Sequence, residues 1–256
     1  MTIFKPAPVR FVEWLSNNQY VDRKHGHHYL YHPRSDAHSQ ALCRMIWEDL
    51  VEASPMIHTH WMTGRIAPGV NYRYAWPGTG KTKTLDLAIG TTPGLSVSMV
   101  TRDPRLDRVL LSCEAKACMT EHGKSQPRLF DELESSYSIV NNGDPAAIAA
   151  GVVVINMATR FVAPLRQTNP RTLDWTYHRQ PAVTENMVRH LRGLRIRTSP
   201  ADSGFDAFCL IVIETDNIAT VTLVTKPPAP AGRDPDSYMQ FLGRIVALYD
   251  ERFAQL

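Results

Sequence analysis

A strand, a helix and a second strand follow one another between residues 108 and 157, and this order most constrains the fold. Residues 108–118 alternate in hydrophobicity, which predicts a strand with one apolar and one polar face. Residues 125–140 repeat apolar side chains at helical spacing, behind a Pro that suits a helix start. Residues 152–157 form an apolar run interrupted only by Asn156, as in strands covered on both faces. The sequence therefore predicts an α/β fold with a central mixed β-sheet flanked by helices.

A second helix is predicted over residues 37–53, whose apolar side chains form one stripe. Asp36 precedes this helix and suits its N-cap position. Asp49 falls inside the stripe and needs a partner there, because an unpaired buried charge is unfavourable. Residues 17–36 are expected to form a loop or surface segment, residues 64–83 strand ends and loops, and residues 166–182 a long polar loop. Further elements are expected as strands over residues 84–89, 207–214 and 219–225 and as a helix over residues 237–254.

The composition is that of a globular chain with a modest net charge. Apolar residues make up 43% of the 256 residues, which is enough for a substantial core. The net charge of +3 is compatible with a nucleic-acid partner but does not require one. The four cysteines form no Cys-x-x-Cys pair, which is typical of a reduced, cytoplasmic protein. No run approaches the roughly 18 apolar residues of a membrane helix, and no signal peptide is evident, so no membrane partner is expected.

Three charged side chains are expected to meet beside the sheet. Asp86 is expected on the strand face opposite to Leu85 and Leu87. Glu114 and Lys116 share a face of the next strand, with their Cα atoms about 6.5–7 Å apart. Two carboxylates beside a phosphate repel, and a hard divalent cation such as Mg²⁺ relieves this repulsion. Because such a cation lowers the pKa of a bound water, the set predicts hydrolysis of a phosphodiester.

The arrangement Asp86…Glu114-Ala115-Lys116, followed by a helix, resembles the PD-(D/E)XK nuclease superfamily, and within it the type II restriction endonucleases. The resemblance covers about residues 80–157. It implies a restriction-endonuclease-like fold and Mg²⁺-dependent, site-specific cleavage of double-stranded DNA that leaves a 5′-phosphate. It further implies that Asp86, Glu114 and Ala115 are metal ligands and that Lys116 is the catalytic lysine.

Three further points follow from this resemblance. Some members add a glutamate from the preceding helix, and Glu52 is the candidate here, with Glu48 behind it. The family often has Pro before the first Asp, where this chain has Leu85. Cutting both strands of a duplex usually needs two active sites, so a symmetric homodimer is expected.

Basic and amide side chains are the candidates for contacts with duplex DNA. Arginine can bind guanine, and asparagine adenine, through paired hydrogen bonds, whereas phosphate contacts mainly position the protein. The candidate DNA-binding residues are Lys81, Lys83, Lys124, Arg166, Asn169, Arg171, Arg192 and Arg195. One nuclease domain is expected over residues 1–256, with a catalytic core over about 37–157. Residues 158–256 would complete the sheet and add recognition loops and the C-terminal helix.

Two other functions stay open at this level. Residues 75–82, which end in Gly80-Lys81-Thr82, fit a permissive phosphate-loop pattern and would indicate a nucleotide-binding ATPase or switch. No convincing apolar strand precedes them, however. The third candidate is a non-catalytic DNA-binding module that keeps a decayed site. The histidines near residues 25–28 and 58–60 lack cysteines at zinc spacing, so they are interpreted as surface positions.

Overall fold

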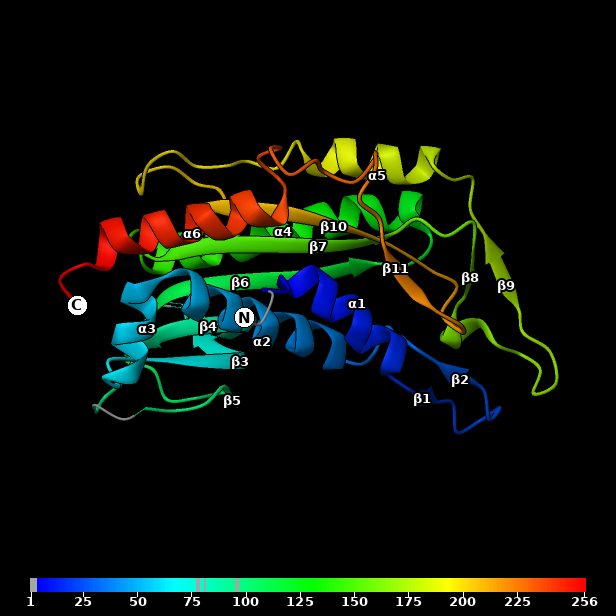
Figure 1. The fold of residues 1–256 in the computed structure, drawn as a ribbon, viewed down its shortest axis with the longest axis horizontal. Coiled ribbons are helices and arrows are strands. Elements are labelled where there is room, and N and C mark those ends of the chain that lie inside the picture. The colour runs from blue at the N-terminus through cyan, green and yellow to red at the C-terminus, as the bar shows by residue number, and fades with distance from the viewer. Residues whose placement is uncertain (1–3, 77–78, 81, 95–96) are drawn as a thin grey trace.

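The computed structural model describes residues 4–76, 79, 80, 82–94 and 97–256. These residues build a seven-stranded sheet in the order β11-β10-β7-β6-β4-β3-β5 (Figure 1). β10, β7 and β6 are mutually parallel, β3 and β5 are parallel, and the other neighbours are antiparallel. The predicted α/β class with a mixed central sheet is therefore confirmed. The strands are β3 Ile66–Ala75, β4 Thr82–Thr91, β5 Thr101–Arg102, β6 Arg108–Cys118, β7 Ile148–Asn156, β10 Ala207–Thr215 and β11 Val221–Leu223.

Helices cover both faces of the sheet (Figure 1). The helices on one face share a core with residues such as Ile89 and Ile211, and those on the other pack with residues such as Ala88 and Leu210. β6 is thus buried from both sides, so the prediction that it exposes a polar face is wrong: Glu114 is only 5% exposed. The first group is α1 Ala7–Asn17, α2 Ala37–Ala53, α3 Pro55–Met62 and α6 Tyr238–Phe253; the second is α4 His122–Gly143 and α5 Ala182–Leu191.

The predicted helices over residues 37–53 and 237–254 are confirmed, and the helix predicted from Ser125 begins one turn earlier, at His122. The expectation of only strand ends and loops over 64–83 is wrong, because the strand β3 occupies half of that segment. The segments 17–36 and 166–182 also contain short strands. The smaller elements are β1 Tyr20–Val21 with β2 His28–Tyr29, β8 Arg160–Val162 with β9 Trp175–Tyr177, and the 3-10 turn Pro164–Arg166.

The sequence pattern predicts roles for two aspartates at α2, and the structure shows their hydrogen-bond partners. The carboxylate of buried Asp49 does find partners, since it accepts hydrogen bonds from the Ala7 amide at 2.7 Å and the Tyr238 hydroxyl at 2.6 Å and pairs with Arg10. Asp36 precedes α2 as predicted, but its side chain does not cap the helix. It accepts a hydrogen bond from the side-chain amide of Asn71 instead.

A change of face interrupts the β3–β4 hairpin. Asn71 has a left-handed backbone with φ of 50° and lies opposite Asp86, since its neighbours pair in continuous register. On one side of this point Leu87 packs against the α2 core, and on the other Leu85 packs against the α4 core. The prediction that Leu85 and Leu87 share a face is therefore wrong. A residue with positive φ reverses the alternation that a regular strand imposes.

None of the described helices has the length and apolar character that a bilayer crossing requires.

Candidate active site

The sheet divides at the position of the predicted site. β4 and β6 pair from Thr91 and Arg108 only as far as Leu87 and Cys113, although both strands continue. Beyond that point β6 stays paired with β7, and β4 stays paired with β3. The first positions inside the resulting fork are Asp86 and Glu114.

A polar cleft of about 480 Å³ lies at this fork. Its floor comes from β4 and β6, one wall from the start of α2 with the segment before it, and the other wall from α4. Such a shape lets a charged chain approach the carboxylates edge-on, between two layers of helices. The lining residues are Tyr31, Pro33, His38, Ser39, Asp86, Ala115, Lys116, Ala117, Cys118, Glu121, Lys124, Ser125, Arg128, Leu129 and Glu132.

The fork brings together the three residues predicted as catalytic. The Oδ2 atom of Asp86 accepts a hydrogen bond of 2.9 Å from the Ala115 amide, which has lost its strand partner at this level. The Nζ atom of Lys116 lies 2.6 Å from Oε1 of Glu114. Ala115, predicted as the main-chain metal ligand, lines the same cleft. Asp86 of β4 is therefore bound to the main chain of β6 at Ala115, which lies between Glu114 and Lys116.

Burial and neighbouring charges shift the protonation of these groups. Burial and then the repulsion of Glu114 raise the pKa of Asp86 to about 7. Burial opposes the charge of Lys116, but the attraction and hydrogen bond of Glu114 outweigh it and raise the pKa of Lys116. Lys116 is thus an ammonium group at neutral pH and donates hydrogen bonds rather than accepting protons.

The donor set fits a hard divalent cation. The Oε2 atom of Glu114 is buried and has no hydrogen-bond partner among the described residues. A buried oxygen of this kind is unfavourable unless a cation or water meets it. Within the described residues, three or more His, Cys, Asp or Glu side chains do not converge anywhere. A cation at the fork would therefore be held by the carboxylates of Asp86 and Glu114 with main-chain and water oxygens, which suits Mg²⁺.

Lys83 belongs to this site, although the sequence indicated only a DNA contact for it. Its ammonium group donates a hydrogen bond of 2.6 Å to the Ser136 hydroxyl of α4. Burial lowers the pKa of Lys83, and the nearby charges that act on it include Glu114, Lys116 and Asp86. The change of face at Asp86 turns Lys83 toward α4, and strict strand alternation could not reveal this.

The accessory acids predicted from α2 do not reach the cleft. Glu48 forms an ion pair with Arg10, and Glu52 is exposed near the end of the helix. α2 instead meets the cleft with its first turn, where His38 and Ser39 lie. At 1.5 Å per residue, Glu48 is roughly 15 Å further along the axis than His38. The helix could be predicted from the sequence, but which of its ends faces the sheet fork could not.

His38 is the residue at the cleft that sequence reasoning missed. Its imidazole packs edge-on against Tyr31, with ring centroids 4.7 Å apart. Burial lowers the pKa of His38 to about 4, so the ring is neutral at physiological pH. A neutral imidazole leaves one nitrogen free to accept a hydrogen bond.

The candidate DNA-binding residues fall into distinct environments. Lys124 lines the cleft, and Arg166 pairs at 2.5 Å with Glu121 of the same cleft. Asn169 and Arg171 are exposed in the loop before β9, and Arg195 is exposed after α5. Arg192 pairs with Asp236 at 2.8 Å and with Asp234 at 3.3 Å, so it anchors the segment before α6. Lys81 lies outside the described residues.

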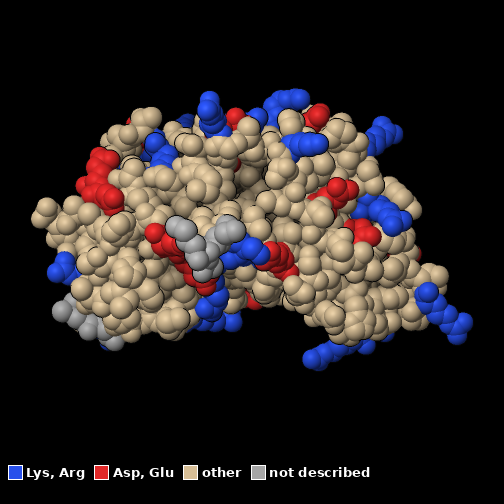
Figure 2. All heavy atoms as spheres, viewed as in Figure 1, with Lys and Arg blue, Asp and Glu red and all other residues tan. Residues whose placement is uncertain are grey.

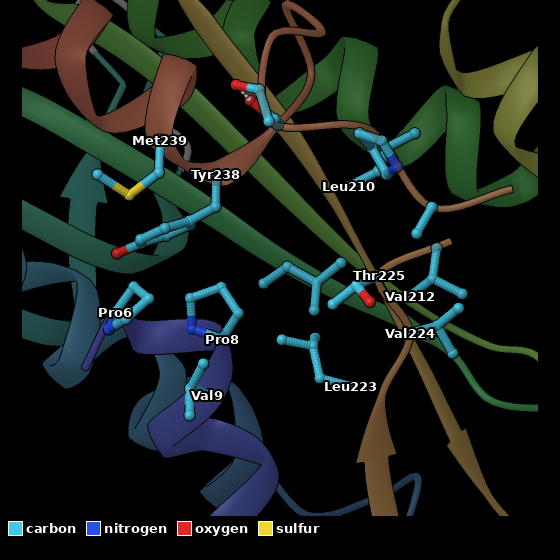
Figure 3. A pocket seen from close by; sticks show the side chains of 15 residues that line it. Pro6, Pro8, Val9, Leu210, Val212, Leu223, Val224, Thr225, Tyr238 and Met239 are labelled. Atoms are coloured by element: carbon cyan, nitrogen blue, oxygen red, sulfur yellow. Dashed lines mark hydrogen bonds between the residues drawn. The ribbon is translucent and has the colours of Figure 1, made fainter. Parts of the chain in front are cut away.

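A second hollow, of about 240 Å³, is apolar. It lies between the start of α1, the strands β10 and β11, and the start of α6. Figure 3 shows Pro8, Val9 and Leu223 at this hollow, with the hydroxyl of Tyr238 directed away from it. That hydroxyl donates a hydrogen bond to Asp49. The lining has no charged side chain, so the polar cleft at the fork is the better site for acid, base or metal chemistry.

Comparisons of this chain with models of protein families, with curated proteins and with solved structures find no match.

Proposed function

We propose that this protein is a Mg²⁺-dependent endonuclease of the type II restriction class, which hydrolyses phosphodiester bonds of double-stranded DNA at specific sites. The observation that carries the proposal is the fork between β4 and β6. There Asp86 and Lys116 line one polar cleft, and Glu114, which pairs with Lys116, has a buried oxygen with no partner among the described residues. The same pattern underlies the resemblance to PD-(D/E)XK nucleases.

The side chains divide the chemistry among them. Mg²⁺, when bound, would lower the pKa of a water molecule and stabilise charge on the leaving oxygen. Asp86 and Glu114 would hold it through their free carboxylate oxygens. Lys116, as an ammonium group, would neutralise charge on the scissile phosphate. Lys83, fixed by Ser136, adds a second cation on the α4 side and would favour a phosphate over a neutral substrate.

The phosphate-loop alternative has less support. In that motif the residue after the lysine opens a helix, whose N-terminus faces the nucleotide phosphates. Here Thr82 begins strand β4 and pairs with Ala75 of the adjacent strand β3. Lys81 itself lies outside the described residues. A nucleotide-dependent rise in melting temperature that is lost in Lys81→Ala would revive this alternative.

Plasmid cleavage tests the proposal. The purified protein with millimolar Mg²⁺ should convert plasmid DNA into discrete fragments. Asp86→Asn keeps the hydrogen bond to Ala115, and Lys116→Met keeps the aliphatic stem, so both should fold and fail to cut. Glu52→Gln is the matched control, because it removes an exposed carboxylate outside the cleft and should cut normally.

The possible outcomes separate the alternatives. A smear of fragments would indicate a nonspecific nuclease, and binding of duplex DNA without cutting would indicate the decayed module. Wild-type cleavage by either cleft variant would disprove the site assignment. Cutting of both strands further implies a symmetric homodimer, which sedimentation of the DNA-bound protein would test.

A further inference from the structure

Two hairpin segments stand beside the cleft and concentrate the basic charge of the chain. Residues 20–34 contain β1 and β2, and residues 159–179 contain β8 and β9. Together these segments, the hairpin extension, hold seven basic and two acidic residues, hence +5, against +3 for the whole chain. The remainder of the protein is therefore net negative. The basic residues are Arg23, Lys24 and Arg34 in the first segment and Arg160, Arg166, Arg171 and Arg179 in the second.

The two hairpin segments form one body. The side chain of buried Asn217 accepts a hydrogen bond from the Tyr31 amide at 2.7 Å and donates to the carbonyls of Tyr31 and Val162 at 3.1 and 2.9 Å. A ring nitrogen of His27 lies 2.9 Å from the carbonyl oxygen of Asn169. The Asn217 side chain thus bridges the main chains of the two segments, and the His27 side chain of the first segment contacts the main chain of the second, so their charges act as one surface.

The hairpin extension also borders the cleft. Tyr31 lines the cleft, and Arg166 pairs with Glu121 on the cleft wall. Thr120, next to Glu121, has its hydroxyl oxygen 2.9 Å from a ring nitrogen of His178. A ligand whose phosphate reaches the fork therefore continues directly over the hairpin extension.

The charges and rings on the hairpin extension are open to a partner. All seven basic residues are exposed, and Arg23, Lys24, Arg34, Arg171 and Arg179 make no ion pair with another described residue. Figure 2 shows basic side chains projecting at the end where Figure 1 places these hairpins, whereas both signs are mixed over α1, α2 and α6.

Aromatic rings accompany these charges. Tyr177 is 74% exposed and pairs across the β8–β9 ladder with Arg160, whose guanidinium lies 4.3 Å from the centre of the Trp175 ring. Rings held among arginines are common where proteins contact nucleic acids.

The basic stretch over residues 189–197 does not offer a comparable surface. Arg192 is occupied by Asp234 and Asp236. Arg197 is fully buried and pairs with Asp206 at 2.6 Å, so it neutralises a buried carboxylate and is not available to a ligand. Two of the four arginines of this stretch are therefore engaged within the fold.

We infer that the hairpin extension is the surface that holds duplex DNA beside the cleft and delivers its backbone to the fork. This inference rests on the proposed nuclease function. Phosphates spaced along a duplex complement a surface of unpaired arginines, and each contact releases counterions. The loop between β8 and β9 then lies where base edges are within reach, so it carries the sequence specificity.

Binding of duplex DNA in Ca²⁺ or EDTA tests the inference without cleavage. Fluorescence anisotropy with a labelled duplex is measured between 50 and 200 mM salt for two triple variants of equal charge change. Arg23→Gln/Arg171→Gln/Arg179→Gln neutralises the hairpin extension. Arg105→Gln/Arg189→Gln/Arg233→Gln neutralises exposed arginines elsewhere. The first variant should bind roughly tenfold or more weakly and lose about 0.9 of salt slope for each contact removed. The second should stay close to wild type.

Each outcome supports or overturns the inference. Equal losses in the two triple variants, or a preference for duplex RNA, would overturn it. If wild type and both variants bind equally but the wild type cuts DNA, the inference fails while the nuclease function stands. If the expected binding difference appears but Mg²⁺ produces no cutting, the surface is correct and the proposed catalytic function fails.

Discussion

Replacing Asp86 by Asn should change how the stability of this protein depends on pH. Burial and then the repulsion of Glu114 raise the pKa of Asp86 from 3.8 to about 7. The folded protein therefore binds this proton more tightly than the unfolded chain does. The stability that the protonated carboxyl contributes is complete below about pH 4 and is lost as the pH rises through 7. At about 1.4 kcal/mol per pKa unit, the loss approaches about 4 kcal/mol by pH 8.

Asn keeps an oxygen for the Ala115 amide but does not titrate. Without metal, Asp86→Asn should therefore be more stable than the wild type at pH 8 by up to about 4 kcal/mol, and nearly equal to it at pH 4. For a chain of this length, 1 kcal/mol corresponds to roughly 2–4 °C in Tm. Urea and thermal denaturation in EDTA across this pH range measure the difference.

Mg²⁺ should then reverse the order of stability at pH 8. A cation at a hundredfold excess over its Kd stabilises the wild type by about 2.7 kcal/mol and should do little for Asp86→Asn. Glu52→Gln is the control, because its carboxylate is exposed and the wild-type pH profile should persist. A difference between Asp86→Asn and wild type that is the same at pH 4 and pH 8 would refute the reasoning, since Asp86 would then titrate normally.

Three other substitutions test separate parts of the structure. Lys83→Met should lower the rate of plasmid cleavage and raise KM for DNA. Ser136→Ala, the comparison variant, should have a smaller effect on both, because Ser136 only orients the ammonium group. Equal cleavage kinetics in wild type and Lys83→Met would show that Lys83 is not part of the site. Arg197→Met should lower the free energy of unfolding in urea by about 3–5 kcal/mol, because it leaves the buried carboxylate of Asp206 without one of its partners. Glu48→Gln should change the free energy of unfolding by less than about 1 kcal/mol and leave cleavage intact, since the glutamate of the ion pair it removes is exposed. Loss of DNA cleavage in this variant would show that Glu48 belongs to the active site.

The sequence predicted the elements whose hydrophobic period is regular. The helix over 37–53 and the final helix are confirmed because their stripes repeat at helical spacing. β7 is confirmed as a buried strand because the first eight of its nine residues are apolar or small enough to be covered on both sides. β3 was missed because its Gly, Pro and Tyr residues do not alternate like those of a typical strand.

The candidate site was predictable in composition but not in arrangement. Asp86, Glu114 and Lys116 could be selected because their spacing places them on adjacent strands. The participation of Lys83 depends on the change of face at Asp86, and that of His38 depends on which end of α2 meets the sheet. Both depend on tertiary packing, which hydrophobic periodicity does not encode.

Arg197 shows the same limit for charged residues. In the sequence it is one more member of a basic stretch, equivalent to Arg189 or Arg195. In the fold Asp206 lies opposite it, nine positions along the chain, and also pairs with Arg252 at 2.6 Å. A charge pattern alone cannot separate an arginine that neutralises a core carboxylate from one that meets solvent.

The sheet ends in β11, with three residues, and in β5, with two. β11 is further engaged at Val221, whose amide donates to the Ser16 hydroxyl of α1. β5 pairs only with Gly69 and Val70, so the rest of the ten-residue β3 has no outer strand partner among the described residues and is the longer margin for lateral pairing with another polypeptide. An association that extends the β-structure from one copy of this protein into the next would therefore use β3.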